Sequence, residues 1–171
     1  IRSRRQRQMC IRDSNIAEPN KLFRIKDNGK FEQINFQVGL EANGYGTGAA
    51  VADIDNDGIL ELLVSRGESK AQTLTLYKAK VDKGSKYLRI KPLNKYGAPA
   101  RGATVTLITN QRKHSKTIDA GSGYLCQMEP VAHYGIRKKE KNFKVEIRWT
   151  NGSKEMIDIK KLNQTIIVRQ K

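Results

Sequence analysis

The residues best suited to do chemistry are the acidic side chains between positions 53 and 61. The segment reads Asp53-Ile54-Asp55-Asn56-Asp57-Gly58-Ile59-Leu60-Glu61, with aspartates at alternate positions and a glycine that permits a sharp bend. If the backbone curls into a loop, five oxygen donors converge on one hard cation: the carboxylates of Asp53, Asp55, Asp57 and Glu61 and the carbonyl oxygen of Ile59. Such a carboxylate-rich oxygen set suits Ca²⁺. The spacing therefore predicts a calcium site, with a solvated aspartate-rich turn that binds nothing as the alternative.

This loop is not the calcium loop of an EF-hand. An EF-hand has a bidentate glutamate at its twelfth position, where this segment has Val64. The segments on both sides read as strands, whereas an EF-hand is flanked by helices. Glu61, at the ninth position, is therefore expected to complete the site.

A second group of residues has the types needed for nucleophilic catalysis. Cys126 and His133 are seven residues apart, and Asp119 precedes them. A cysteine nucleophile with a histidine base is a known arrangement, so a hydrolase is one hypothesis. The neighbours of Cys126 favour packing instead, because they are apolar: Leu125, Met128 and Val131. We therefore predict that the protein is not an enzyme.

The segments that must position these residues read as short extended runs between turn residues. Val145, Ile147 and Trp149 alternate with Glu146 and Arg148, which is typical of a half-buried strand and places the tryptophan in the core. Asp27-Asn28-Gly29 and Asn151-Gly152 predict hairpin turns. No segment after residue 14 has a sustained helical period of apolar residues. The sequence predicts an all-β fold with strands at 22–25, 30–34, 49–52, 61–65, 73–77, 87–90, 103–109, 115–119, 143–149, 154–159 and 165–169.

Charge is unevenly spread along the chain of 171 residues, whose net charge is +16. Residues 15–80 carry eight basic and nine acidic side chains, whereas residues 81–171 carry twenty basic and seven acidic ones. A basic half of this kind favours an anionic partner, and a lysine-rich solvated surface is the alternative. Apolar runs are too short for a transmembrane helix, so no membrane span is predicted.

The first residues do not read as part of a folded protein. Arg4 to Ser14 resemble, codon by codon, the forward translation of a sequencing adapter used in transposase-based libraries. We interpret residues 1–14 as an artefact of this kind and exclude them from fold reasoning. A basic arm that binds nucleic acid is the alternative.

The remaining motifs resemble two known families. Asn20 to Arg24, Gly29 to Phe31 and the segment 48–64 resemble an FG-GAP (VCBS-type) repeat, the blade of calcium-binding β-propellers. Residues 97–105 and 119–135 resemble the opening and the core motif of the ASPIC/UnbV module. The resemblance implies a blade fragment at 15–82 and a small β-sandwich-like module at 83–171. Glu61 departs from the usual blade pattern, which has Asp at the ninth loop position.

The resemblance implies a secreted propeller protein of the extracellular matrix type. The first functional hypothesis is a non-enzymatic, calcium-binding interaction module with an extracellular protein or glycan as partner. The alternative is a module that binds a polyanion, such as a sulfated glycan, through Arg137-Lys138-Lys139 and the turn Gln111-Arg112-Lys113-His114. Nucleic acid is not expected as a partner, since aromatic residues do not interleave with the basic clusters. Asn151-Gly152-Ser153 and Asn163-Gln164-Thr165 are sequons that matter only in a secreted chain.

Overall fold

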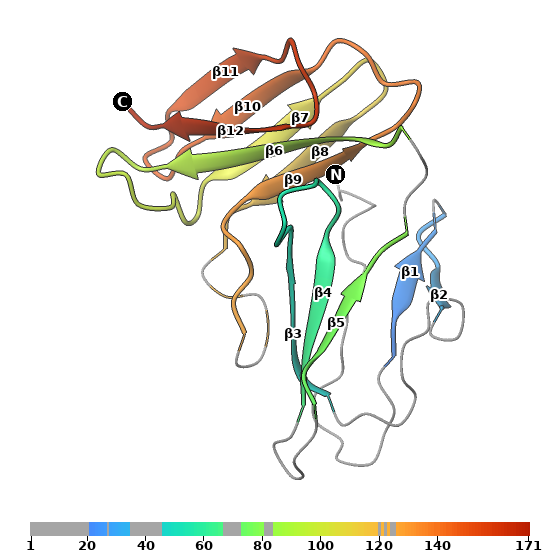
Figure 1. Ribbon diagram of the computed structural model, residues 1–171. Helices are drawn as coiled ribbons and strands as arrows, with labels where there is room; N and C mark the ends of the chain where they lie inside the picture. The colour runs from blue at the N-terminus through green and yellow to red at the C-terminus, as the bar shows by residue number, and fades with distance from the viewer. Residues whose placement is uncertain are drawn as a thin grey trace. The chain divides into compact units, whose positions relative to one another are not determined.

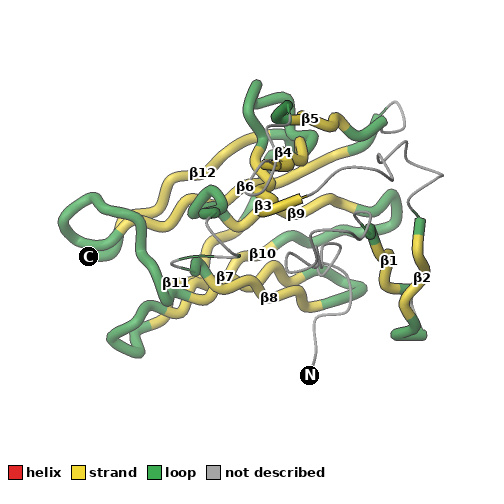
Figure 2. Tube along the Cα trace, turned by 90° about the horizontal axis from the view of Figure 1, so that it is seen from below, coloured by secondary structure: helices red, strands yellow, loops and turns green. Residues whose placement is uncertain are grey.

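The computed structural model describes residues 21–26, 28–34, 46–66, 73–80, 84–119, 121, 123 and 126–171. In this part of the chain all regular elements are strands (Figure 2), so the predicted all-β fold class is confirmed. The residues interpreted as a translated adapter, 1–14, lie outside the described residues. The chain divides into two compact units, and each is described by itself below.

The first unit contains two small antiparallel sheets (Figure 1), one of two strands and one of three. The two-stranded sheet is the predicted hairpin, in which Gly29 has a φ of 80° and the Lys26 amide donates to the Lys30 carbonyl at 2.9 Å. Glycine adopts a positive φ without steric strain because it has no Cβ atom, which is why the turn forms here. The strands of this unit are β1 (Phe23–Ile25), β2 (Phe31–Gln33), β3 (Gly46–Ala52), β4 (Glu61–Arg66) and β5 (Thr75–Lys78).

The three-stranded sheet has the order β3-β4-β5, and its apolar side chains are buried to different degrees. Val64 of β4 is fully buried, whereas Leu74 and Leu76 are 61% and 52% exposed. Phe31 of the two-stranded sheet is 63% exposed. Large apolar side chains exposed in this way mark surfaces that other protein segments commonly cover.

The second unit contains seven strands in two sheets. One sheet has the order β11-β10-β7-β8 and is antiparallel throughout. The other has the order β12-β6-β9, in which β12 runs parallel to β6 and β9 antiparallel to it. The strands are β6 (Lys86–Leu93), β7 (Thr104–Ile108), β8 (Lys113–Thr117), β9 (Ala132–Ile136), β10 (Lys144–Arg148), β11 (Lys154–Asp158) and β12 (Gln164–Arg169).

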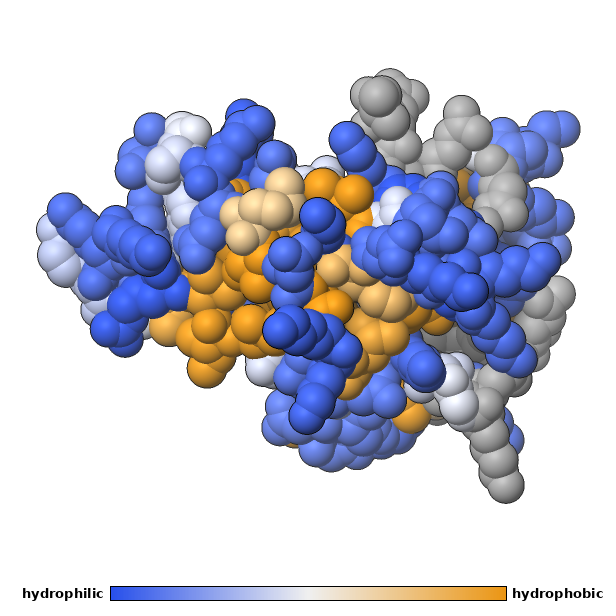
Figure 3. Space-filling view, turned by 90° about the horizontal axis from the view of Figure 1, so that it is seen from above, coloured by the Kyte–Doolittle hydropathy of each residue, from blue (hydrophilic) through white to orange (hydrophobic). Residues whose placement is uncertain are grey.

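The two sheets of this unit lie face to face (Figure 1), and their inward side chains form one core. Leu88 and Ile90 of β6 are fully buried, as are Val145 and Ile147 of β10. Trp149 is also buried, so its predicted place in the core is confirmed. Burying each aliphatic side chain contributes about 1.5–3 kcal/mol, so this core accounts for much of the unit's stability. On the surface seen from above, an apolar patch is bordered on both sides by hydrophilic side chains (Figure 3).

One strand was not predicted, and several predicted strand bounds differ from those of the structure. The strand β9 was not predicted, although Ala132, Tyr134 and Ile136 alternate with His133 and Gly135; the run is short, and glycine is a poor strand former. Its register with β6, in which Tyr134 pairs with Leu88, comes from pairing with a distant segment. The strand predicted at 115–119 begins and ends two residues earlier, at Lys113–Thr117.

The predicted β10–β11 hairpin forms at Asn151-Gly152, where Gly152 has a φ of 85°. The first sequon therefore lies in an exposed turn, and the Oδ1 atom of Asn151 accepts a hydrogen bond from the Ser153 amide at 3.0 Å. Asn163 of the second sequon has a φ of 57°, and its Oδ1 atom accepts a hydrogen bond from the Tyr87 amide at 3.0 Å. The second asparagine therefore has a structural role.

Candidate metal centre

The acidic segment forms the loop between β3 and β4, as predicted. Ala52 and Glu61 are paired in the β3–β4 register, so the hairpin itself closes the loop. Asn56 and Gly58 have φ angles of 60° and 84°, and two such left-handed residues let the backbone curl within a few residues. Carboxylate oxygens accept hydrogen bonds from backbone amides of this loop. The Gly58 amide, for example, donates to Asp53 Oδ2 at 3.0 Å.

Three of the predicted ligands come together in this loop. Carboxylate oxygens of Asp53, Asp55 and Glu61 lie within 4.8 Å of one another. Asp53 and Glu61 are buried, with exposed fractions of 4% and 3%, whereas Asp55 is exposed. Like charges this close repel one another, so the arrangement requires compensating positive charge. Lys78 of β5 provides some, because its Nζ atom lies 3.3 Å from Glu61 Oε1.

The other two predicted ligands have local roles in the loop. Asp57 is outside the group of three carboxylates, and its Oδ1 atom accepts a hydrogen bond from the Ile59 amide at 2.8 Å. Asp55 Oδ1 likewise accepts from the Asp57 amide, at 3.2 Å. These are turns in which an aspartate side chain binds the backbone two residues on. Ligation by Asp57 and by the Ile59 carbonyl stays a prediction.

Arg89 of β6 is the residue at this site that sequence reasoning missed. Its side chain is 3% exposed, and its Nη1 atom lies 2.9 Å from Asp53 Oδ2 and donates to Asn56 Oδ1 at 2.9 Å. Its Nη2 atom donates to Glu129 Oε1. A buried ion pair of this kind gains little net stability, but removing one partner leaves a buried charge uncompensated. The signal in the sequence was a basic residue between two apolar ones in a predicted strand.

Gly58 fixes how closely the loop packs on β6. A Cβ atom at this position would lie 2.0 Å from both Cδ1 and Cε1 of Tyr87, so the ring of Tyr87 occupies the space that a side chain would need. Together with Arg89, Tyr87 gives the loop two contacts on the same strand, from residues two apart on one face. The sequence predicted the bend at Gly58 but not this contact.

His133 of β9 has a packing role. It is buried, and its ring stacks on Tyr87 with the ring centroids 6.0 Å apart and the planes 4° from parallel. Burial, with help from the charges of Lys116 and Arg89, lowers the pKa of His133 to about 4. The imidazole is therefore neutral at physiological pH and a weak base.

The other two residues of the hydrolase hypothesis also have structural partners. The Sγ atom of Cys126 donates to the Ala49 carbonyl oxygen at 2.9 Å. The backbone carbonyl of Asp119 accepts a hydrogen bond from Arg101 Nη1 at 3.1 Å, and the residue is exposed. These contacts are those of packing and turn residues.

Comparison with family models places two segments of the chain. The FG-GAP-like repeat matches residues 9–64, and the ASPIC and UnbV family matches residues 94–171. The two matches follow in the order that the motifs predicted. Among the described residues, no helix is long and apolar enough to cross a membrane.

Comparison with individual proteins gives three relatives of one kind. Cartilage acidic protein 1 from Homo sapiens is 44% identical over 141 residues, which is 80% of this chain and 21% of that protein. The Mus musculus protein of the same name is 44% identical over 141 residues, and the Xenopus tropicalis protein is 44% identical over 138 residues. The chain thus spans about a fifth of the length of the curated relatives it matches.

Proposed function

Because the chain is homologous to cartilage acidic protein 1 and has an FG-GAP-like repeat followed by an ASPIC and UnbV segment, we propose that it is part of a secreted calcium-binding interaction protein. Cartilage is a tissue rich in extracellular matrix, and the name of the relatives describes a tissue component rather than a reaction. The stacking of His133 on Tyr87 and the hydrogen bond from Cys126 to the Ala49 carbonyl support a non-enzymatic function.

The observation that carries the calcium proposal is the buried acidic group in the β3–β4 loop. FG-GAP repeats often bind Ca²⁺, and here oxygens of three carboxylates lie within 4.8 Å of one another in such a repeat. Asp53, Asp55 and Glu61 would hold the ion, with Asp57 and the Ile59 carbonyl completing the oxygen set. Asp53 would offer its Oδ1 atom, because Oδ2 accepts the donors of Arg89 and Gly58. The donor set is all oxygen, which is what Ca²⁺ prefers.

Calcium would act on stability rather than on chemistry. A divalent ion supplies the positive charge that three close carboxylates lack, and it binds the folded loop in preference to the unfolded chain. Such a ligand stabilises the folded state by about 2.7 kcal/mol when its concentration is a hundred times its Kd. The loop would then be held rigid next to β6, where Arg89 and Tyr87 contact it.

The test is calcium-dependent unfolding of the full chain. Chelator-treated protein is heated with and without added Ca²⁺, and calcium binding is measured by titration calorimetry. We expect Ca²⁺ to raise the Tm of the parent chain and to leave the Tm of Asp55→Asn unchanged. Asp158→Asn is the matched control, because Asp158 is an exposed aspartate of β11 outside the loop, and it should respond as the parent does. Equal calcium responses of Asp55→Asn and Asp158→Asn would overturn the proposal.

The exposed apolar residues of the first unit support its interpretation as a propeller blade. Blades pack against neighbouring blades, and Phe31, Leu74 and Leu76 present the apolar surface that such packing covers. Sequencing the native transcript upstream of residue 15 tests this interpretation together with secretion. Further Asp-x-Asp-x-Asp-Gly loops and a signal peptide are expected, and a transcript without them would contradict both.

A further inference from the structure

We propose that two basic turns of the second unit form one binding surface for a sulfated polysaccharide. The turns are residues 109–113, which connect β7 to β8 and include the first residue of β8, and residues 137–141, after β9; together they are called the two-turn surface. The inference rests on the proposed extracellular function, because sulfated polysaccharides are extracellular. It identifies the class of partner and the residues that bind it.

Direct hydrogen bonds join the two turns, although they are far apart in the sequence. The Asn110 amide donates to the Lys141 carbonyl at 3.1 Å, and the Lys141 amide donates to Asn110 Oδ1 at 2.7 Å. The Nε2 atom of Gln111 donates to the Lys139 carbonyl at 3.2 Å. These bonds use backbone groups of the second turn, so the lysine side chains there are not needed to hold the turns together.

Glu140 is buried beneath the two turns and contacts a residue of each. Its side chain is fully buried, forms an ion pair with the Nε atom of Arg112 and accepts a hydrogen bond from the Arg137 amide at 3.0 Å. Arg112 also donates to the Gly135 carbonyl at 2.9 Å, which ties the first turn to β9. The only acidic residue of the two turns is thus buried and neutralised, so it does not reduce the positive potential outside.

Four lysines form the exposed basic part of the two-turn surface. The turns contain six basic residues against one glutamate. Lys113, Lys138, Lys139 and Lys141 are exposed, and none of them forms an ion pair within the described part of the chain.

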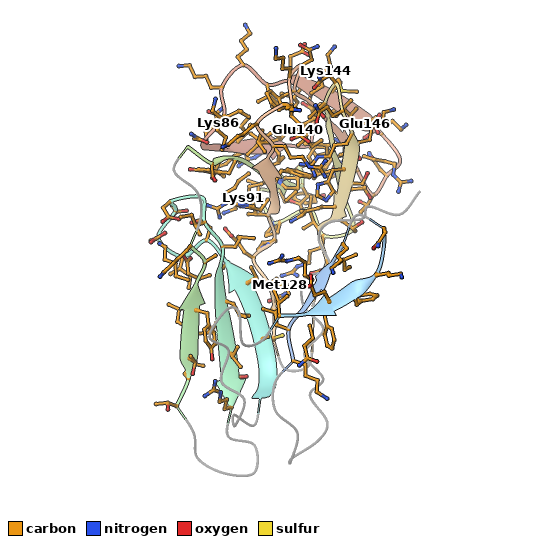
Figure 4. The ribbon with its side chains drawn as sticks, turned by 90° about the vertical axis from the view of Figure 1, so that its right-hand side faces the viewer. Lys86, Lys91, Met128, Glu140, Lys144 and Glu146 are labelled. Carbon is orange, nitrogen blue, oxygen red and sulfur yellow. The ribbon has the colours of Figure 1, made fainter. Side chains whose placement is uncertain are left out.

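The lysines at strand β10 differ from the lysines of the two turns because they form ion pairs. The Nζ atom of Lys144 lies 3.5 Å from Asp158 Oδ1, and Glu146 Oε2 lies 3.8 Å from Lys154 Nζ, so these two lysines have acidic partners (Figure 4 labels Lys144 and Glu146). By contrast, the four exposed lysines of the two turns have no acidic partner within the described residues, and the hydrogen bonds between the turns bring them onto one surface.

A sulfated polysaccharide fits this surface better than a single-stranded nucleic acid. Sulfate groups repeat along such a chain and are bound by clustered lysine and arginine through charge. Proteins that bind single-stranded nucleic acid add aromatic side chains on which bases stack. Residues 109–113 and 137–141 include no aromatic residue. Four flexible lysines over a rigid base suit a ligand recognised by its charge.

The experiment measures binding of the full chain to a size-defined heparin oligosaccharide by fluorescence anisotropy over a range of salt concentrations. The test variant carries Lys138→Glu and Lys139→Glu. The matched control carries Lys160→Glu and Lys161→Glu, which reverse two adjacent exposed lysines in the β11–β12 connection and change the net charge equally. Thermal unfolding of both variants checks that the fold is kept.

The test variant should lose about tenfold or more in affinity near physiological salt. The slope of log K against the logarithm of salt concentration should become shallower by about two. The control should change affinity by less than about threefold. Equal losses in the two variants, or no loss in the first, would overturn the proposal. A single-stranded DNA of equal charge that binds as tightly as heparin would overturn the choice of ligand.

Asp55→Asn separates this proposal from the calcium proposal. The variant should bind heparin as the parent does, because Asp55 lies in the β3–β4 loop and not in either basic turn. If calcium binding fails its own test while heparin binding depends on Lys138 and Lys139, the two-turn surface stands alone. Loss of heparin binding in Asp55→Asn without unfolding would contradict an independent surface.

Discussion

Replacing Gly58 with alanine tests whether the acidic loop packs on β6 as the structure shows. Gly58 has a φ of 84°, and an added Cβ atom would lie 2.0 Å from two ring carbons of Tyr87. Two penalties therefore act on this variant. One is the backbone strain of a left-handed conformation, and the other is displacement of an aromatic ring.

The backbone strain and the steric overlap each have a known range of free-energy cost. A non-glycine residue in the left-handed region costs about 1–2 kcal/mol. Forcing atoms into a packed site costs about 1–3 kcal/mol more. Gly58→Ala should therefore lower the free energy of unfolding by about 2–5 kcal/mol. Gly152→Ala is the matched control, because Gly152 has a φ of 85° and no atom within 4 Å of the added Cβ position, so it should cost only the strain.

The assay is urea denaturation of the parent, both alanine variants, Tyr87→Ala and the double variant Gly58→Ala with Tyr87→Ala. In the Tyr87→Ala background the obstacle is gone, so Gly58→Ala should cost about the same as Gly152→Ala. The double-mutant cycle should then give a coupling of about 1–3 kcal/mol. A coupling near zero, with Gly58→Ala no worse than Gly152→Ala, would refute the packing of this loop on Tyr87.

Two further predictions concern buried charge. Arg89→Ala should lower the free energy of unfolding by about 3–5 kcal/mol in urea denaturation, because Asp53 then stays buried without its partner. Arg89→Met combined with Asp53→Asn should recover part of this loss. A double variant that recovers none of it would contradict the ion pair. Burial lowers the pKa of both His114 and His133 to about 4, so the unfolded chain binds protons from about pH 6.5 downward and the folded chain does not. Stability should therefore fall between about pH 6.5 and 4, and urea midpoints that stay constant from pH 7 to 5 would contradict this.

The parts of the fold that the sequence predicted are those set by local geometry. Asn151-Gly152 fixes a hairpin because glycine alone takes the required φ without strain, and the alternation of Val145, Ile147 and Trp149 fixes which face is buried. The strand β9 was missed because its alternating run is only five residues long and contains a glycine, and its pairing partner, β6, is distant in the sequence. Parallel pairing of β12 with β6 left no local signal either.

The same division holds at the candidate sites. The sequence by itself determined the loop of Asp53, Asp55 and Glu61, because three carboxylates within nine residues of one hairpin need only a local bend to meet. Only the tertiary structure brought Arg89 to Asn56, 33 residues away, and Arg112 to Glu140, 28 residues away. Those contacts depend on sheet order and register, which come from burying both sheet faces at once, and no short stretch of sequence contains that information.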